Sequence, residues 1–238
     1  MNDLEIIGLD YSYGREVKAL DGVGFSVPSG SVVGLLGPNG SGKSTLIKNV
    51  FDLLESQAGT IAVGGSPHTT PEAKREAVYL SSNDYLPEFL TAAEYVAMMA
   101  GFYGLEVDRE DAADLFSRFA MDGRYDDLIE NFSHGMRKKT QLIVALLVRR
   151  RLTVIDETLN GVDLEALHLA EKELAGLRDE GRSVLLCTHD FPVLERIADE
   201  IVFLDHGRVV FNAPTAGLVD EYGSLERMVY GYLEAGER

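Results

Sequence analysis

A glycine-rich loop followed by a lysine and a serine carries the most direct chemistry in this sequence. Glycines let a backbone wrap a triphosphate with its N–H groups pointing inward. We expect Lys43 to reach the β- and γ-phosphates and Ser44 to bind Mg²⁺. The loop lies between an apolar run at 32–36 and a helix predicted over 43–54, the context that supports nucleotide binding. The pattern G-x-x-x-x-G-K-[ST] and the residue after it, all expected to contact the nucleotide, are Gly37, Pro38, Asn39, Gly40, Ser41, Gly42, Lys43, Ser44 and Thr45.

Two acids and a histidine stand at the ends of two other apolar runs. Asp156 and Glu157 end the run that starts at Leu152, and His189 follows the run 183–187. Asp156 is expected to hold Mg²⁺ through its water shell. Glu157 is expected to orient and deprotonate an attacking water, and His189 to touch the γ-phosphate or that water. Taken alone, His189 fits a strand-end histidine bonded to backbone better than a catalytic one.

A Ser-x-Gly turn opens a predicted helix at Ser133 and Gly135. Free N–H groups at a helix start attract anions, although most such turns are simply helix caps. Tyr13, beside Gly14, is either a sheet-face tyrosine or an aromatic platform for a base. Neither feature defines a function by itself.

In this order, the segments resemble the ATP-binding-cassette (ABC) ATPase family over nearly the whole chain. Residues 37–45 look like its Walker A loop, 132–136 its signature, 152–157 its Walker B strand and 160–163, ending at Asp163, its D-loop. The resemblance makes His189 the switch histidine and Tyr13 the residue that stacks on adenine. It implies ATP and Mg²⁺ as cofactors and an active ATPase.

The resemblance also implies a mechanism and partners. Two such domains pair head to tail, as a homodimer or with a second cassette, so that Ser133 and Gly135 of one copy contact the γ-phosphate bound by the other. Loss of the γ-phosphate on hydrolysis loosens the pair. A permease on a separate chain would convert this closure into transport, which places the chain on the inner face of the cell membrane. Met136 and the segment 224–230 resemble export-type, antibiotic-resistance cassettes.

Departures from the family pattern leave alternatives open. Ser82 stands where the family usually has a glutamine, and serine is too short to reach Mg²⁺ and water. Thr158 replaces the usual proline after Glu157, and His134 replaces the first signature glycine. The alternative to an exporter ATPase is therefore an ATP-binding regulatory module with little turnover. A third reading, a cassette acting on ribosomes or chromosomes, usually needs two cassettes or a coiled coil, and neither is evident here.

The composition of the chain limits which partners and cellular compartments are expected. The chain has 238 residues and a formal net charge of −17, which disfavours a general nucleic-acid partner. The one cysteine, Cys187, cannot form an internal disulfide and suits a reducing cytoplasm. The start shows no basic stretch ahead of an apolar core, so no signal peptide is expected. The apolar runs are too short to span a membrane.

The elements that must position these residues indicate an α/β fold. We expect a single ABC ATPase domain over 1–238: a P-loop NTPase (RecA-like) core with an N-terminal antiparallel β-subdomain and an inserted α-helical subdomain. Residues 1–84 and 148–220 form the core with its β-subdomain, 85–147 the helical subdomain and 221–238 a C-terminal helix. Predicted helices cover 92–102, 110–119, 136–148 and 164–177, buried strands cover 152–156 and 183–187, and a hairpin covers 201–211.

Overall fold

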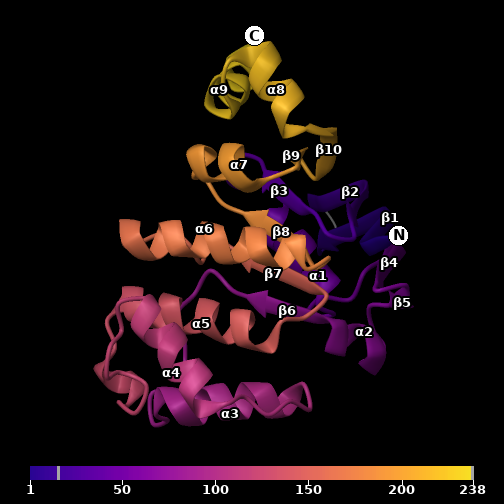
Figure 1. The fold of residues 1–238 in the computed structure, drawn as a ribbon. Coiled ribbons are helices and arrows are strands. Elements are labelled where there is room, and N and C mark those ends of the chain that lie inside the picture. The colour runs from indigo at the N-terminus through magenta and orange to yellow at the C-terminus, as the bar shows by residue number, and fades with distance from the viewer. Residues whose placement is uncertain (15–16, 237–238) are drawn as a thin grey trace.

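The computed structural model describes residues 1–14 and 17–236 as an α/β fold with two sheets and a layer of helices (Figure 1). The strands are β1 Asn2–Tyr13, β2 Val17–Pro28, β3 Val32–Leu36, β4 Ala58–Val63, β5 Ser66–Pro67, β6 Ala77–Leu80, β7 Leu152–Asp156, β8 Ser183–Cys187, β9 Glu200–Asp205 and β10 Arg208–Pro214. The helices are α1 Lys43–Val50, α2 Pro71–Glu76, α3 Ala92–Phe102, α4 Arg109–Arg118, α5 His134–Val148, α6 Leu164–Asp179, α7 Phe191–Ile197, α8 Thr215–Tyr222 and α9 Leu225–Gly236, with a 3-10 turn at Ile129–Asn131.

The central sheet has the strand order β10-β9-β3-β8-β7-β6, with β10 antiparallel to β9 and the other neighbours parallel. Its inner strands β3, β7 and β8 are buried at every position. They read as continuous apolar runs because both faces of the sheet are covered. In β3, Val32 and Leu36 face the core under the helices, and Val33 and Leu35 face the core under the second sheet.

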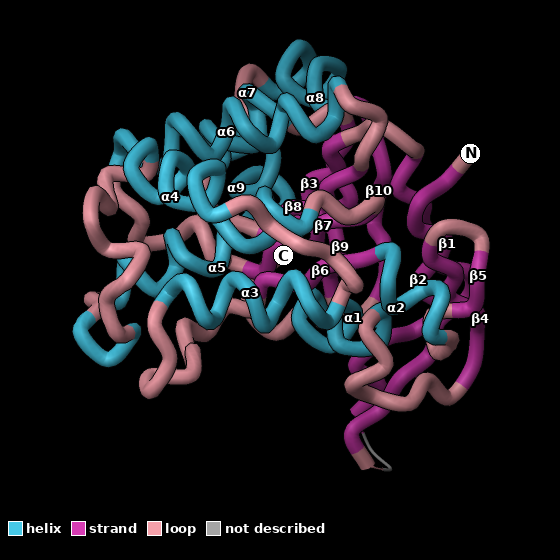
Figure 2. The backbone as a smooth tube through the Cα atoms, turned by 60° about the horizontal axis from the view of Figure 1, so that its bottom comes forward, coloured by secondary structure: helices cyan, strands magenta, loops and turns pink. Residues whose placement is uncertain are grey.

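The second sheet is antiparallel, with the order β2-β1-β4-β5, and lies at the side of the molecule away from α3–α6 (Figure 2). Leu4 and Ile6 of β1 and Ile61 of β4 contribute to the core that it shares with the central sheet. Helix α1 adds Leu46 and Ile47 to the same core. The helix that follows the glycine loop is therefore held in the space between two sheets.

Three helices, α3, α4 and α5, lie at the end of the molecule opposite α8 and α9 (Figure 1). Helix α3 begins with a capping box, in which Thr91 and Glu94 satisfy each other's backbone N–H groups. Asp108 caps α4, and Ser133 caps α5 through the N–H of Met136. These caps set where each helix begins, which for α5 places Ser133 at an exposed helix start.

The C-terminal helix α9 packs on the edge of the central sheet. The Tyr232 hydroxyl donates to Oδ2 of Asp205 at 3.0 Å, and its ring meets Phe203 edge-on at 4.9 Å. Leu225 and Met228 of α9 are buried in the main core. Residue 221, where the sequence analysis begins the C-terminal segment, lies within α8, and residues 237–238 of that segment lie outside the described residues.

The antiparallel opening, the two buried strands and the 201–211 hairpin are confirmed by the strand pairing. The helix predicted over 43–54 is wrong at its end, because α1 stops at Val50 and Asp52 adopts a left-handed φ of 55°. The turn lets the ring of Phe51 stack on Tyr79. The short strand β6 was not anticipated. None of the described helices combines the length and apolarity needed to cross a membrane.

Candidate nucleotide-binding and hydrolysis site

The predicted site residues follow three neighbouring parallel strands. The glycine loop leaves β3, His189 follows β8, and Asp156 and Glu157 end β7, with β8 lying between β3 and β7. Carboxyl ends of parallel strands meet at one edge of a sheet, where α/β proteins bind ligands. The fold therefore collects these separate segments into one site.

The glycine loop needs glycine for steric reasons at both ends. Gly37 has a φ of 154°, and a Cβ there would lie 2.0 Å from the carbonyl oxygen of Leu204. Gly42, the N-cap of α1, has a φ of 108°, and its Cβ would lie 2.6 Å from the carbonyl oxygen of Ala19. The loop can approach β9 and β2 this closely only because these positions lack side chains.

Lys43, the first residue of α1, is buried, and its side chain bonds back to the glycine loop. Its Nζ donates to the carbonyl oxygens of Gly37 at 2.8 Å and Pro38 at 3.1 Å. An ammonium group has three donors, so one remains for an anion above the loop. Ser41 is also buried, and its Oγ has no hydrogen-bond partner among the described residues. The loop thus holds polar groups with hydrogen-bonding capacity left for a ligand.

A cavity of about 540 Å³ opens over this loop. Tyr13 lies at its wall with 54% of the residue exposed. Its ring meets Tyr11 at 4.9 Å in a T-shaped contact, and its hydroxyl lies 3.2 Å from that of Thr45. Glu157 reaches the same cavity from β7. The volume suits a drug-sized ligand such as a nucleotide. The lining residues are Tyr13, Val17, Lys18, Ala19, Asn39, Gly40, Gly42, Lys43, Ser44, Thr45, Glu157, His206 and Gly207.

Asp156 is 2% exposed and is surrounded by hydrogen-bond donors. Burial and the neighbouring Glu157 raise its pKa, while hydrogen bonds from Cys187, Tyr79 and Ser44 oppose that rise. The Tyr79 hydroxyl lies 3.3 Å from Oδ2 of Asp156. Ser44 is exposed at the start of α1 beside this carboxyl group. An oxygen pair of this kind, hydroxyl and carboxylate, is suited to Mg²⁺.

Glu157 and His189 form an ion pair or hydrogen bond, with Nε2 of His189 2.9 Å from Oε1 of Glu157. Glu157 has a left-handed φ of 55°, and its N–H donates to the carbonyl oxygen of Cys187 at 2.8 Å. Such a backbone conformation is unfavourable for a non-glycine residue and is found at functional sites. Both side chains are partly exposed, as proton transfer with a bound water requires.

The signature and D-loop segments lie together but outside the cavity. A Cβ on Gly135 would lie 3.4 Å from the carbonyl oxygen of Gly161. Lys138 donates to the carbonyl oxygen of Asn160 at 2.6 Å, and Lys139 pairs with Asp163 at 2.5 Å. Ser133, Gly135 and Asp163 do not line the nucleotide cavity of their own chain. They form a second surface, separate from the one around Lys43.

Two side chains with a place in the site were not predicted. Tyr79 of β6 contacts Asp156, and buried Thr158 donates from its hydroxyl toward the carbonyl oxygens of Leu80 and Ser81, 3.1 Å from each. Thr158 was treated only as a tolerated replacement for proline. Its position directly after the acid pair is the one sequence signal that could have drawn attention to it.

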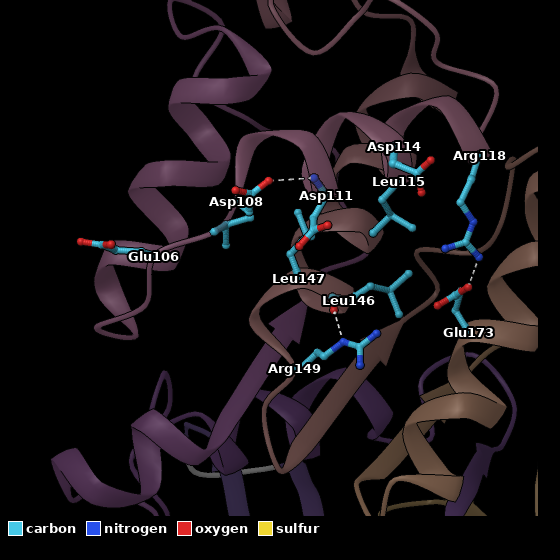
Figure 3. A pocket seen from close by; sticks show the side chains of 11 residues that line it. Glu106, Asp108, Asp111, Asp114, Leu115, Arg118, Leu146, Leu147, Arg149 and Glu173 are labelled. Carbon is cyan, nitrogen blue, oxygen red and sulfur yellow. Dashed lines mark hydrogen bonds and ion pairs between the residues drawn. The ribbon is translucent and has the colours of Figure 1, made fainter.

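A second hollow, of about 430 Å³, lies between α4, the end of α5 and Glu173 of α6 (Figure 3). Five carboxylates line it, from Glu106, Asp108, Asp111, Asp114 and Glu173. None of the predicted site residues is among its lining residues. So much negative charge opposes binding of a triphosphate, so this hollow is not the nucleotide site.

Metal binding depends on few protein groups here. Among residues 1–14 and 17–236, no three histidine, cysteine or acidic side chains gather into a metal-binding group. Mg²⁺ often takes only one or two protein ligands together with water and phosphate oxygens. Ser44 and Asp156 beside a phosphate-binding loop therefore fit Mg²⁺ and would not fit a metal that needs an all-protein cage.

Comparison with known proteins agrees with this geometry. Residues 20–160 match the family model described as ABC transporter. The chain is 34% identical over 225 residues to the daunorubicin/doxorubicin resistance ATP-binding protein DrrA of Streptomyces peucetius, covering 93% of this chain and 68% of that protein. It is 32% identical to the Nod factor export ATP-binding protein I of Sinorhizobium fredii, covering 92% of this chain and 64% of that one. The chain therefore spans about two thirds of the length of these relatives.

A solved structure of an ATP-binding subunit of an ABC transporter superposes with a TM-score of 0.88 at 30% identity, covering 97% of this chain and 99% of that one. The chain belongs to the ABC transporter family. It is an ATP-binding subunit that binds ATP with Mg²⁺ and hydrolyses it.

Proposed function

We propose that this chain powers export across the cell membrane by pairing head to tail with a second cassette when ATP is bound. The single observation that carries its catalytic part is the 2.9 Å contact between Glu157 and His189 beside the glycine loop. Export is supported by two relatives, a daunorubicin/doxorubicin resistance protein and a Nod factor export protein. The contacts that select the exported compound belong to the membrane subunit.

The proposed roles of the residues around ATP follow from their chemistry. Tyr13 stacks on adenine, the N–H groups of residues 37–45 bind the phosphates, and Lys43 neutralises the β- and γ-phosphates. Ser44 and Asp156 hold Mg²⁺, which supplies charge neutralisation at the phosphates when bound.

Glu157 accepts the proton of the attacking water, and His189 orients that water and the Glu157 carboxylate. This assignment is supported by the position of Glu157 in the cavity wall and by its short contact to His189. A general base must lie within hydrogen-bond reach of the proton that it takes, and a third group commonly orients it.

Ser133, Gly135 and Asp163 are proposed to act on the nucleotide of the partner cassette. All three lie outside the cavity of their own chain, and Ser133 is exposed at the N-terminus of α5. That helix start offers free N–H groups to an anion. Removal of the γ-phosphate then weakens the pair, so hydrolysis resets the assembly.

We propose a permease on a separate chain as the membrane partner, with this subunit at the cytoplasmic face. Within the proposed helical subdomain, 85–147, Tyr85, Phe89 and Phe102 are 85%, 80% and 71% exposed. Such large exposed apolar side chains are suited to burial against another protein. The segment that carries Tyr85 and Phe89 is tied to α5 by pairs between Asp84 and His134 and between Glu88 and Arg137, each at 2.6 Å.

The experiment uses Glu157→Gln, which keeps size and removes the base. We expect ATP hydrolysis to fall by roughly 10²-fold or more, the scale of a lost general base. The same variant with Mg²⁺ and ATP should double in mass in light scattering at high protein concentration. Unchanged hydrolysis, or a variant that stays single-copy with ATP even beside its membrane subunit, would refute the proposal.

A regulatory module with little turnover is the second candidate, favoured by Ser82. Its side chain is exposed and makes no hydrogen bond among the described residues. A turnover assay with Mg²⁺ and ATP separates the two candidates, since activity well above background eliminates the module.

A further inference from the structure

The strand that leads out of the core toward the helical subdomain contacts the proposed metal ligand. Tyr79 lies on β6, which pairs in parallel with β7 so that Tyr79 stands opposite Val154. Its hydroxyl donates to Oδ2 of Asp156 at 3.3 Å. Asp156 is 2% exposed and Tyr79 is partly buried, so this bond is partly shielded from water. Shielded bonds to a carboxylate are stronger than those at a surface.

The ring that carries this hydroxyl is held in place. Tyr79 stacks on Phe51, with centroids 4.9 Å apart and an interplanar angle of 22°. Phe51 is the C-cap of α1, the helix that follows the glycine loop. An ionised carboxylate only accepts hydrogen bonds, so the Tyr79 hydroxyl is the donor in its bond to Asp156.

The side chains of Ser82 and Asn83, which follow Tyr79, do not bond to Asp156. Ser82 is exposed and makes no hydrogen bond among the described residues. The side-chain oxygen of Asn83 accepts from the N–H of Tyr85 at 3.3 Å and from the Ser81 hydroxyl at 3.2 Å. In the segment 79–83, it is Tyr79 whose side chain bonds to Asp156.

We propose that Tyr79 is a positioning residue that orients the Asp156 carboxylate toward Mg²⁺ and thereby links β6 to the metal site. Donors behind a metal ligand fix its orientation and tune its affinity. A carboxylate oxygen has more than one lone pair, so the bond from Tyr79 leaves acceptor capacity for a Mg²⁺-bound water. The inference rests on the proposed role of Asp156.

Tyr79→Phe tests the proposal, because it removes the hydroxyl and keeps the ring stacked on Phe51. The measurement is the affinity of a fluorescent, non-hydrolysable ATP analogue at increasing Mg²⁺. We expect the Mg²⁺ concentration at half-maximal effect to rise roughly tenfold, the low end for a lost outer-shell partner. Affinity for the analogue without Mg²⁺ should stay close to that of the unaltered protein, since Tyr79 does not line the nucleotide cavity.

Tyr103→Phe is the matched control. Its hydroxyl also bonds to β6, donating to the carbonyl oxygen of Ala77 at 3.0 Å, but it touches no carboxylate among the described residues. We expect this variant to respond to Mg²⁺ like the unaltered protein. A general loosening of β6 would shift both variants alike, whereas loss of metal positioning shifts only Tyr79→Phe.

Asp156→Asn separates this inference from the proposed function. If Asp156→Asn weakens the Mg²⁺ response and Tyr79→Phe leaves it unchanged or strengthens it, the positioning role is wrong and the proposed site stands. Equal shifts in Tyr79→Phe and Tyr103→Phe would also overturn the inference. If Asp156→Asn itself leaves the Mg²⁺ response intact, the proposed metal ligand is wrong.

Discussion

Nε2 of His189 lies 2.9 Å from Oε1 of Glu157, a contact between residues that follow two adjacent parallel strands. The backbone of Glu157 is held in the left-handed region by a bond from its N–H to Cys187. The carboxylate is thereby aimed from the strand end into the nucleotide cavity.

His189→Ala removes the group that orients Glu157. We expect turnover to fall by roughly 10²-fold, at the low end for a positioned proton-transfer group, because the carboxylate remains but is no longer held. Nucleotide affinity should change little, since His189 does not line the cavity. Steady-state hydrolysis and analogue binding provide the two measurements. His168→Ala, on α6, is the matched control. A large loss of affinity with unchanged turnover would contradict the assigned role.

Gly37→Ala places a Cβ where the carbonyl oxygen of Leu204 lies only 2.0 Å away. The backbone must move, so we expect lost nucleotide binding and a destabilisation of about 3 kcal/mol or more. Gly176→Ala is the control, because it is helical and a Cβ there meets nothing within 4 Å. That variant should gain up to about 1 kcal/mol. Thermal unfolding measures the stability of both variants, and binding of an ATP analogue measures their nucleotide affinity. A stable Gly37→Ala variant that binds ATP would argue against the close approach of Gly37 to Leu204.

Thr158→Val keeps shape and removes the hydroxyl that bonds toward Leu80 and Ser81. Since Thr158 and Leu80 are buried and Ser81 is partly buried, we expect a loss of about 1–3 kcal/mol in unfolding free energy. Thr158→Ser keeps the hydroxyl and should lose less. Denaturant unfolding of the two variants gives the comparison. If valine is nearly neutral and serine is destabilising, packing of the methyl group, and not the hydrogen bond, is what matters.

Lys139→Met removes the amine that bonds to Asp163 at 2.5 Å and to the carbonyl oxygen of Phe119 at 2.9 Å. The D-loop should lose its fixed position, and ATP-driven pairing should weaken. Nucleotide affinity of the single copy should persist, because Asp163 does not line its cavity. Light scattering of Glu157→Gln with and without Lys139→Met measures this effect. If the double variant dimerises with ATP as strongly as Glu157→Gln alone, Lys139 has no role in pairing.

The ion pair between Lys139 and Asp163 should also make the stability of the fold depend on pH in the acid range. The hydrogen bond from Lys139, and after it the N–H of Ala166, lower the pKa of Asp163 below its usual 3.8. A lowered folded-state pKa stabilises the fold above pH 3.8 and loses that stabilisation as the pH falls toward the folded-state value. Lys139→Met should flatten this part of the stability profile. The measurement is the unfolding free energy of both proteins as a function of pH, from pH 5 down to the lowest pH at which they stay folded. If its slope against pH is the same in the variant, the pair contributes nothing to stability.

Much of the site could be predicted because its parts are local patterns. An apolar strand, a glycine loop and a lysine-led helix are consecutive, so Gly37 to Thr45 are recognisable without knowledge of the fold. The acid pair at the end of β7 and the histidine after β8 are equally local, each marked by the buried strand before it. The family resemblance depends on the order of these patterns along the chain.

Other features depend on the register and packing of distant segments. Strand β3 lies beside β8 and β9, and β7 beside β6, an order that no local pattern encodes. Contacts such as Tyr79 with Asp156 and Thr158 with Leu80 join residues more than 70 positions apart. The end of α1 at Val50 likewise follows from where Phe51 can stack.

The sequence by itself determined which residues can bind a nucleotide, hold Mg²⁺ and activate water, because those abilities reside in side-chain types and short spacings. Only the tertiary structure decided which of them meet. It brought Glu157 to His189 and Tyr79 to Asp156, and it left Ser133 and Gly135 outside their own cavity. The physical reason is that strand order and helix packing depend on burial of the whole core. Residues far apart in the chain contribute to that burial together, so no short segment determines it alone.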